Sequence, residues 1–169
     1  MFGFFKKGDK KETLPVEKEL LYSPANGIVV PVSDVADPVF SQKMMGDGFA
    51  VIPTDGNIYS PAKGKVLSVF PTKHAVGILL DSGLELLLHM GLDTVELNGK
   101  PFEFFVKEGQ ALTADTLIAK VDMAQLQEAG KDSAMVVVIT NMDKVKSFSL
   151  DVTGETAVKA EIGSVLPKE

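Results

Sequence analysis

Short apolar runs that alternate with turn residues are the feature that most constrains the fold of this chain. Val, Ile and Leu gather in brief segments, and glycine, proline, asparagine or aspartate separates one segment from the next. Such spacing is typical of an all-β protein. The segments predicted to be strands are Gly27–Val30, Gly48–Ile52, Gly64–Phe70, Ala75–Leu80, Leu84–His89, Met135–Ile139 and Thr156–Val158.

Local signals also predict turns and one helix. Asp81-Ser82-Gly83 and Asn98-Gly99 contain residues that tolerate positive φ, so both are expected to form hairpin turns. A short helix is expected to begin after Asp122 as its N-cap and to stop at Gly130.

A weak internal repeat is visible in the first half of the chain. Ser23-Pro24-Ala25-Asn26-Gly27-Ile28-Val29 recurs as Ser60-Pro61-Ala62-Lys63-Gly64-Lys65-Val66. Each proline would stand at the beginning of a strand, where no ladder hydrogen bond is lost. The repeat therefore indicates a duplicated hairpin unit in a barrel or sandwich.

The N-terminal segment differs in composition from the rest. Residues 1–18 are charged and interrupted by Gly3, Gly8 and Pro15, so we expect a flexible tail ahead of a single domain over residues 19–169. No stretch has the roughly 20 apolar residues of a membrane span, and no signal-peptide run is present. We therefore expect a cytoplasmic protein.

Two interpretations of residues 1–11 remain open. The aromatic and basic residues of this segment are Phe2, Phe4, Phe5, Lys6, Lys7, Lys10 and Lys11. The segment is either a disordered tail or a weak contact with an anionic membrane surface, in which aromatic rings insert and lysines meet headgroups. The second interpretation would place the protein peripherally at the inner face of the membrane.

Charge and residue usage exclude several function classes. The net charge is −6 and no basic block lies outside the N-terminus, so a nucleic-acid partner is not expected. All 17 basic residues are lysine, so the chain cannot offer an arginine fork to a phosphate. Cysteine is absent, which removes disulfides, thiolate nucleophiles and cysteine-rich zinc sites.

The chain contains only two histidines, His74 and His89, on the two predicted strands joined by the turn at Ser82. Folding these strands back places residue 74 opposite a position near 90, so the two imidazoles can be neighbours. A neutral imidazole can attack phosphorus through one ring nitrogen while the other keeps its proton. The second imidazole can then donate to phosphoryl oxygens, although either histidine could instead be a structural residue.

Several separated motifs resemble glucose-type enzyme IIA of the phosphoenolpyruvate-dependent sugar phosphotransferase system. The run Leu86–Leu97, which contains His89, is similar to the phosphorylation-site signature of that family. The resemblance extends over nearly all of residues 20–166. The other matching segments are Val39-Phe40, Met45-Gly46-Asp47-Gly48, Phe70–Ala75, Lys107-Glu108-Gly109 and Thr140-Asn141-Met142-Asp143.

The resemblance implies an antiparallel β-sandwich or barrel-sandwich hybrid with one or two short helices. It also implies a phosphoryl carrier, with His89 as acceptor, His74 as the group that stabilises the phosphoryl oxygens, and Thr72 orienting His74. The donor would be the phosphocarrier protein HPr, and the acceptor a cysteine on the IIB domain of a sugar permease, expected to be glucose-type. The unphosphorylated form could bind regulatory protein targets.

The resemblance also places partner-docking residues around the histidines. From the residues alone, the apolar members are core candidates, and Asp93 is a turn former, a metal ligand or a charge that faces a partner. An apolar collar would exclude water and form a docking patch. The expected rim consists of Val39, Phe40, Met44, Met45, Phe70, Leu87, Asp93 and Val95.

Two other functions compete with this interpretation. A zinc hydrolase could use His74, His89 and Asp93 as its three ligands, but no third histidine is left to act as general base. A biotinyl or lipoyl carrier is suggested by Val106–Leu112, yet no lysine stands in the required hairpin-tip motif. We therefore expect no required cofactor, with zinc at the histidine pair only as an adventitious or regulatory ion.

Overall fold

The computed structural model describes residues 17–169. Residues 1–16 lie outside the described residues. They include nearly all of the predicted tail, residues 1–18, and the whole segment 1–11 for which membrane contact was considered. The first strand, β1 (Glu19–Tyr22), begins where the domain is predicted to begin. Within residues 17–169, no helix is long and apolar enough to cross a membrane.

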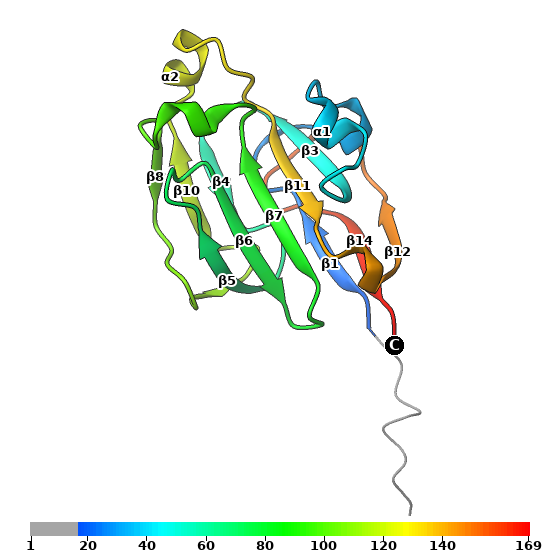
Figure 1. Cartoon of the computed structure of the whole chain (residues 1–169). Helices are drawn as coiled ribbons and strands as arrows, with labels where there is room; N and C mark the ends of the chain where they lie inside the picture. Colours follow the sequence, from blue (N-terminus) through cyan, green and yellow to red (C-terminus); the bar gives the residue numbers. More distant parts are fainter. Residues whose placement is uncertain (1–16) are drawn as a thin grey trace, which may run out of the picture.

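Residues 17–169 form three antiparallel sheets (Figure 1). The largest contains, in spatial order, β13 (Gly154–Thr156), β2 (Gly27–Pro31), β3 (Asp47–Pro53), β11 (Met135–Ile139), β7 (Glu85–Met90), β6 (Ala75–Leu80), β5 (Gly64–Val69) and β9 (Ala111–Leu112). A second sheet contains β1, β14 (Glu161–Pro167) and β12 (Val145–Leu150). The third contains β4 (Asn57–Tyr59), β10 (Leu117–Val121) and β8 (Phe102–Phe104).

Helical segments are short and lie between strands. Those of residues 17–169 are η2 (Val32–Asp34), α1 (Pro38–Ser41), η3 (Thr94–Leu97), α2 (Met123–Glu128) and η4 (Met142–Lys144). The α2 helix follows its predicted limits, because the Asp122 side chain accepts from the Gln125 N–H at 3.1 Å and Gly130 adopts a φ of 71°. The prediction of an antiparallel all-β fold with one or two short α-helices is confirmed.

Two local predictions are wrong. The strand expected at Thr156–Val158 is β13, which ends at Thr156, and the chain then turns, closed by the Ala160 N–H on the Ala157 carbonyl at 3.2 Å. Asn98-Gly99 has the expected left-handed backbone, with φ of 54° and 80°, but it follows η3 instead of joining two strands. Positive φ is needed by many turns, so these residues alone do not identify a hairpin.

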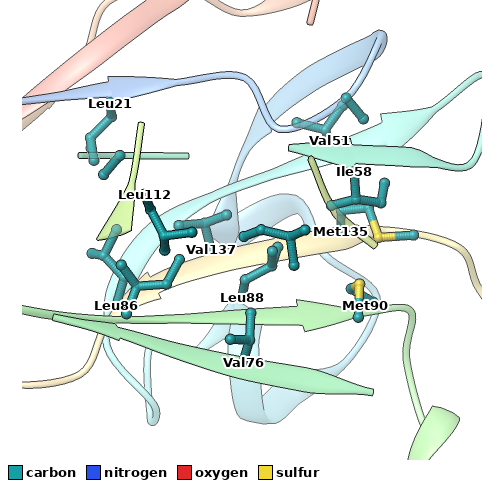
Figure 2. Close-up of a cluster of buried hydrophobic side chains, with 14 of the residues drawn as sticks. Leu21, Val51, Ile58, Val76, Leu86, Leu88, Met90, Leu112, Met135 and Val137 are labelled. Atoms are coloured by element: carbon teal, nitrogen blue, oxygen red, sulfur yellow. The ribbon is translucent and has the colours of Figure 1, made fainter. Parts of the chain in front are cut away.

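The main hydrophobic core fills the inner face of the large sheet, as Figure 2 shows for a cluster that draws on many strands. Leu86, Leu88 and Met90 of β7 enter this core because alternate residues of a strand share a face. The residues labelled in Figure 2 are Leu21, Val51, Ile58, Val76, Leu86, Leu88, Met90, Leu112, Met135 and Val137.

The outer face of the same sheet carries a second, smaller core. It is covered partly by η2 and α1, and it consists of Val32, Val35, Phe40, Ala50, Ala75, Leu87, Leu92, Ala134, Val136 and Val138. The Asp37 side chain caps α1 by accepting from the Val39 N–H at 2.9 Å. Because the middle strands are covered on both faces, Leu86, Leu87 and Leu88 of β7 form a continuous apolar run before His89.

The two copies of the sequence repeat occupy equivalent positions. Tyr22 donates its N–H to the Pro61 carbonyl, and Tyr59 donates its N–H to the Pro24 carbonyl, each at 2.8 Å. The first serine of each copy is buried and donates its hydroxyl to the carbonyl two residues ahead. This reciprocal pairing supports the duplicated hairpin unit that the repeat indicated.

Candidate functional site

The β6–β7 hairpin brings the two histidines together. Ala75 pairs with His89 across the strands, and the Met90 N–H donates to the His74 carbonyl at 2.8 Å. This register agrees with the pairing predicted from the turn at Ser82. The two imidazole centroids lie 5.0 Å apart, and the ring planes are inclined by 75°. The rings are therefore direct neighbours at the end of the hairpin opposite its turn.

A backbone carbonyl determines which nitrogen of His89 is free. His89 Nδ1 lies 2.7 Å from the Gly91 carbonyl oxygen. A carbonyl can only accept a hydrogen bond, so Nδ1 must carry the proton in the neutral ring. The lone pair of Nε2 is then available for nucleophilic attack.

The turn that supplies this carbonyl is held on several sides. The Gly91 N–H donates to the Ala134 carbonyl at 2.9 Å, and the buried Thr94 hydroxyl donates to the Met90 carbonyl at 2.7 Å. Gly91 has a φ of 80°, and a Cβ there would lie 2.6 Å from Thr94 Cγ2. Only glycine fits this position, because a side chain would strain the backbone and meet Thr94. The sequence analysis did not identify Gly91 as a site residue.

His74 is supported differently. Only 6% of the residue is exposed, and its Nδ1 lies 2.5 Å from the Thr72 hydroxyl oxygen. A hydroxyl can donate or accept, so this contact is compatible with both tautomers of His74. The intervening Lys73 adopts a φ of 58°, which is unusual for a residue with a side chain. The Phe70 ring packs edge-on to His74 at 5.5 Å.

Burial favours the neutral form of both rings. The pKa of His89 is lowered mainly by burial, against the opposing effects of its bond to Gly91 and of the carboxylates of Asp37 and Asp93. The pKa of His74 is lowered by burial and by the neighbouring His89. Both imidazoles are therefore uncharged near neutral pH, which is the nucleophilic state.

The residues predicted to form the docking rim divide into two groups. Val39, Met44, Met45, Phe70, Asp93 and Val95 are exposed. Phe40 and Leu87 are instead buried in the outer-face core, with exposed fractions of 5% and 7%. The Phe40 ring contacts His89 edge-on at 5.1 Å. These two side chains support the site from beneath and do not offer surface to a partner.

Asp37 belongs to the site although the sequence analysis missed it. Its carboxylate acts on His89, and it lines a hollow beside α1 together with Pro38, Leu92 and Asp93. The sequence does contain one local signal here: Asp37 directly precedes Pro38, and such a pair is typical of the start of a helix. That signal predicts a helix start and does not predict proximity to a residue 52 positions ahead in the sequence.

The described residues do not form the metal centre of a zinc hydrolase. Over residues 17–169, no three His, Cys, Asp or Glu side chains are grouped so as to hold a metal ion. A catalytic zinc site normally uses three protein ligands and a water molecule. The alternative based on His74, His89 and Asp93 is therefore not supported.

Comparison with known proteins agrees with the geometry of the site. The family model described as phosphoenolpyruvate-dependent sugar phosphotransferase system, EIIA 1, matches residues 19–145. A glucose-specific EIIA component of the phosphotransferase system from Halalkalibacterium halodurans is 43% identical over 92% of this chain and 90% of that protein. The glucose-specific EIICBA component of Streptococcus pneumoniae is 52% identical over 87% of this chain, which spans only 20% of that longer protein.

A solved structure shows the same architecture. The chain superimposes on glucose permease IIA from Mycoplasma capricolum with a TM-score of 0.80 and 34% sequence identity, covering 88% of this chain and 96% of that one. This likeness confirms the predicted sandwich fold, and the sequence relatives confirm the predicted family. The chain belongs to the EIIA 1 family of the phosphoenolpyruvate-dependent sugar phosphotransferase system, and it is a phosphoryl carrier of that system.

Proposed function

We propose that His89 carries the phosphoryl group on Nε2. The observation that carries this proposal is the 2.7 Å contact between His89 Nδ1 and the Gly91 carbonyl. It fixes the proton on Nδ1 and leaves the Nε2 lone pair free in the neutral ring, which burial favours. His74 has no equivalent constraint on its tautomer.

The two transfer steps balance without a cofactor. In the first, the Nε2 lone pair of His89 forms a bond to phosphorus while the bond from phosphorus to the donor breaks and its electron pair returns to the donor. In the second, a thiolate of the acceptor attacks phosphorus and the electron pair of the N–P bond returns to Nε2. In both steps the proton stays on Nδ1 and is donated to the Gly91 carbonyl.

His74 and Thr72 stabilise the transferred group in this proposal. If the Thr72 hydroxyl donates to His74 Nδ1, the proton of His74 is on Nε2, where it can be donated to phosphoryl oxygens. The chain contains no arginine, so it has no bidentate guanidinium clamp for the phosphoryl group. Moderate affinity for the phosphoryl group suits a carrier, because tight ground-state binding would slow onward transfer.

The exposed rim is proposed to dock two partners in turn, the donor HPr and the IIB domain of a glucose-type permease. Apolar side chains such as Met44 and Val95 would exclude water from the transferred group. The carboxylates of Asp37 and Asp93 line one hollow close enough to His89 to act on its pKa, and they favour partners that bring positive charge. The name of the pneumococcal relative joins EIIA to EIIB and EIIC, which supports a IIB domain as acceptor.

The proposal is tested by reconstitution. The protein is incubated with phosphoenolpyruvate, enzyme I and HPr, and the adduct is analysed by intact mass and acid stability. We expect one acid-labile phosphoryl group per chain, which moves to a purified glucose-type IIB domain when this is added. An adduct that survives acid, as a phosphoserine would, contradicts the assignment to histidine.

We propose three further roles. Residues 1–11 contact anionic membrane surfaces, the protein works at the cytoplasmic face of the membrane, and the unphosphorylated rim binds regulatory proteins. Sedimentation with anionic and neutral vesicles, at low and high salt, tests the first by comparing the full chain with one lacking residues 1–11. Equal partitioning of the two proteins in all conditions contradicts membrane contact.

A further inference from the structure

One stretch of chain, residues 91–99, supplies the carbonyl that binds His89 and also contacts the peptide that carries Thr72. It begins at the end of β7 with Gly91, whose carbonyl holds His89 Nδ1, and it continues through η3 to the turn at Asn98-Gly99. From there it leads into β8, a path that can be followed between β7 and β8 in Figure 1. Gly99 lies at the far end of this stretch, next to Thr72 and Lys73.

Gly99 packs against the peptide that carries Thr72. A Cβ placed on Gly99 would lie 3.2 Å from the Thr72 carbonyl oxygen and 3.6 Å from Lys73 Cβ. Carbon and oxygen at 3.2 Å are closer than the ordinary contact distance, so one of them would have to move. The bare backbone of Gly99 is therefore what allows the Thr72–Lys73 peptide to lie where it does.

The Thr72–Lys73 turn also has backbone hydrogen bonds of its own, one of which joins the Phe70 N–H to the Ala75 carbonyl at 3.1 Å. The Lys73 N–H donates to the Phe70 carbonyl at 2.7 Å and closes the turn, yet Lys73 is held at a φ of 58°. A left-handed residue with a side chain persists only where its surroundings determine it. The Thr72 hydroxyl reaches His74 Nδ1 from this turn, so a displaced peptide would displace the hydroxyl as well.

We infer that Gly99 is a positioning residue for His74, and that it acts through the Thr72–Lys73 peptide. The inference rests on the proposed role of His74 in phosphoryl transfer. It assigns to the stretch of residues 91–99 a second function besides supplying the Gly91 carbonyl for His89. A side chain at position 99 should loosen the Thr72–His74 hydrogen bond and leave the His89–Gly91 hydrogen bond intact.

Two glycines provide matched substitutions. Gly99 and Gly109 have nearly the same φ, 80° and 84°, but a Cβ on Gly109 would meet nothing within 4 Å. Gly99→Ala and Gly109→Ala therefore impose similar backbone strain, and only the first adds a contact with Thr72. Gly99→Asn serves as a second variant, because asparagine accepts the left-handed conformation more readily than alanine does.

The first measurement is the tautomer of each histidine, read from the ring nitrogen shifts by NMR. In Gly99→Ala we expect the tautomer equilibrium of His74 to move toward that of Thr72→Ala, and the Nδ1–H of His89 to remain. Gly109→Ala should match the unmodified protein at both rings. Equal spectra for Gly99→Ala and Gly109→Ala would overturn the inference, whatever the transfer rates are.

The second measurement separates uptake from onward transfer. In Gly99→Ala we expect uptake from HPr to be unchanged and onward transfer to the IIB domain to fall about tenfold, less than the roughly hundredfold attributed to loss of one preorganised donor. In a Thr72→Ala background, Gly99→Ala should produce no further loss, since the two residues act in one chain of contacts. Additive losses would show that Gly99 acts elsewhere.

Failure of this inference can be distinguished from failure of the proposed function. If the unmodified protein accepts no phosphoryl group on His89, the proposed function is wrong, and the NMR comparison still decides whether Gly99 sets the tautomer of His74. If transfer proceeds normally in both glycine variants while the His74 tautomer is unchanged, only the positioning role is wrong.

Discussion

His74 and His89 lie at the same end of the β6–β7 hairpin, but their Nδ1 atoms are held by different groups. His89 donates to a backbone carbonyl, which can only accept, whereas His74 contacts a side-chain hydroxyl, which can donate or accept. The first support leaves one protonation pattern for a neutral ring, and the second leaves two. A nucleophile needs a fixed lone pair, and a group that stabilises a moving phosphoryl needs a proton it can direct. The difference supports the two proposed roles, His89 as nucleophile and His74 as stabilising group.

Removing the nucleophile should have the largest effect. His89→Ala is expected to fold and to accept no phosphoryl group from HPr, because no other ring nitrogen is held with a free lone pair toward the site. Intact mass after incubation with the donor system measures the adduct, and circular dichroism checks the fold. If the variant still gains an acid-labile phosphoryl group, the roles of the two histidines must be reassigned.

Replacing the second histidine should separate the two transfer steps. His74→Gln keeps a side-chain donor near the phosphoryl group but loses the imidazole, so uptake on His89 should persist. Onward transfer to the IIB domain should slow by roughly a hundredfold, the cost of displacing one preorganised donor. Rapid-quench kinetics of the two steps provide the measurement. Unchanged onward transfer would leave His74 as a packing residue.

Removing the hydroxyl that orients His74 should have a smaller effect. Thr72→Ala deletes one neutral hydrogen bond worth about 0.5–1.5 kcal/mol, which corresponds to a roughly two- to twelvefold slower transfer. Thr72→Ser keeps the hydroxyl and serves as the control, so it should retain most of the rate. Equal losses in the two variants would indicate that the threonine methyl group matters and the hydroxyl does not.

The smallest expected effect is on stability against pH. Both histidines have a pKa below 6.5 in the folded chain, so the unfolded chain binds more protons as the pH falls through that value. The free energy of unfolding should therefore be independent of these rings above pH 6.5 and decrease below it. Denaturant titrations at several pH values should show a steeper decrease for the natural chain than for the His74→Gln, His89→Ala double variant. Parallel curves for the two proteins contradict the lowered pKa values.

The hairpin that carries the site could be predicted from the sequence, because its turn and its strand pattern are local. Asp81-Ser82-Gly83 fixes where the chain reverses, and counting outward from it brings His74 and His89 together. Successive residues of a strand face opposite sides of the sheet, so Leu88 enters the inner core while His89 faces the other side. These features depend on neighbours in the sequence.

The residues that pack over His89 on the outer face of the sheet could not be predicted from local sequence patterns. Asp37 and Phe40 reach His89 only because α1 folds over the outer face of the sheet, and no local pattern shows that. Phe40 and Leu87 were expected at the docking rim, but the second core buries them. The Gly91 carbonyl is a backbone group, so residue identity does not reveal it. Whether both faces of a strand are buried depends on contacts with residues distant in the sequence, so it requires the three-dimensional structure.

The measurement that most directly tests the central claim is the position of phosphorus on the ring. NMR of the phosphorylated, nitrogen-15 labelled protein detects coupling between phosphorus and the nitrogen to which it is bonded. The contact between His89 Nδ1 and the Gly91 carbonyl predicts phosphorus on Nε2 of His89, with the Nδ1 proton retained. Coupling to Nδ1 of His89, or to either nitrogen of His74, would contradict the account.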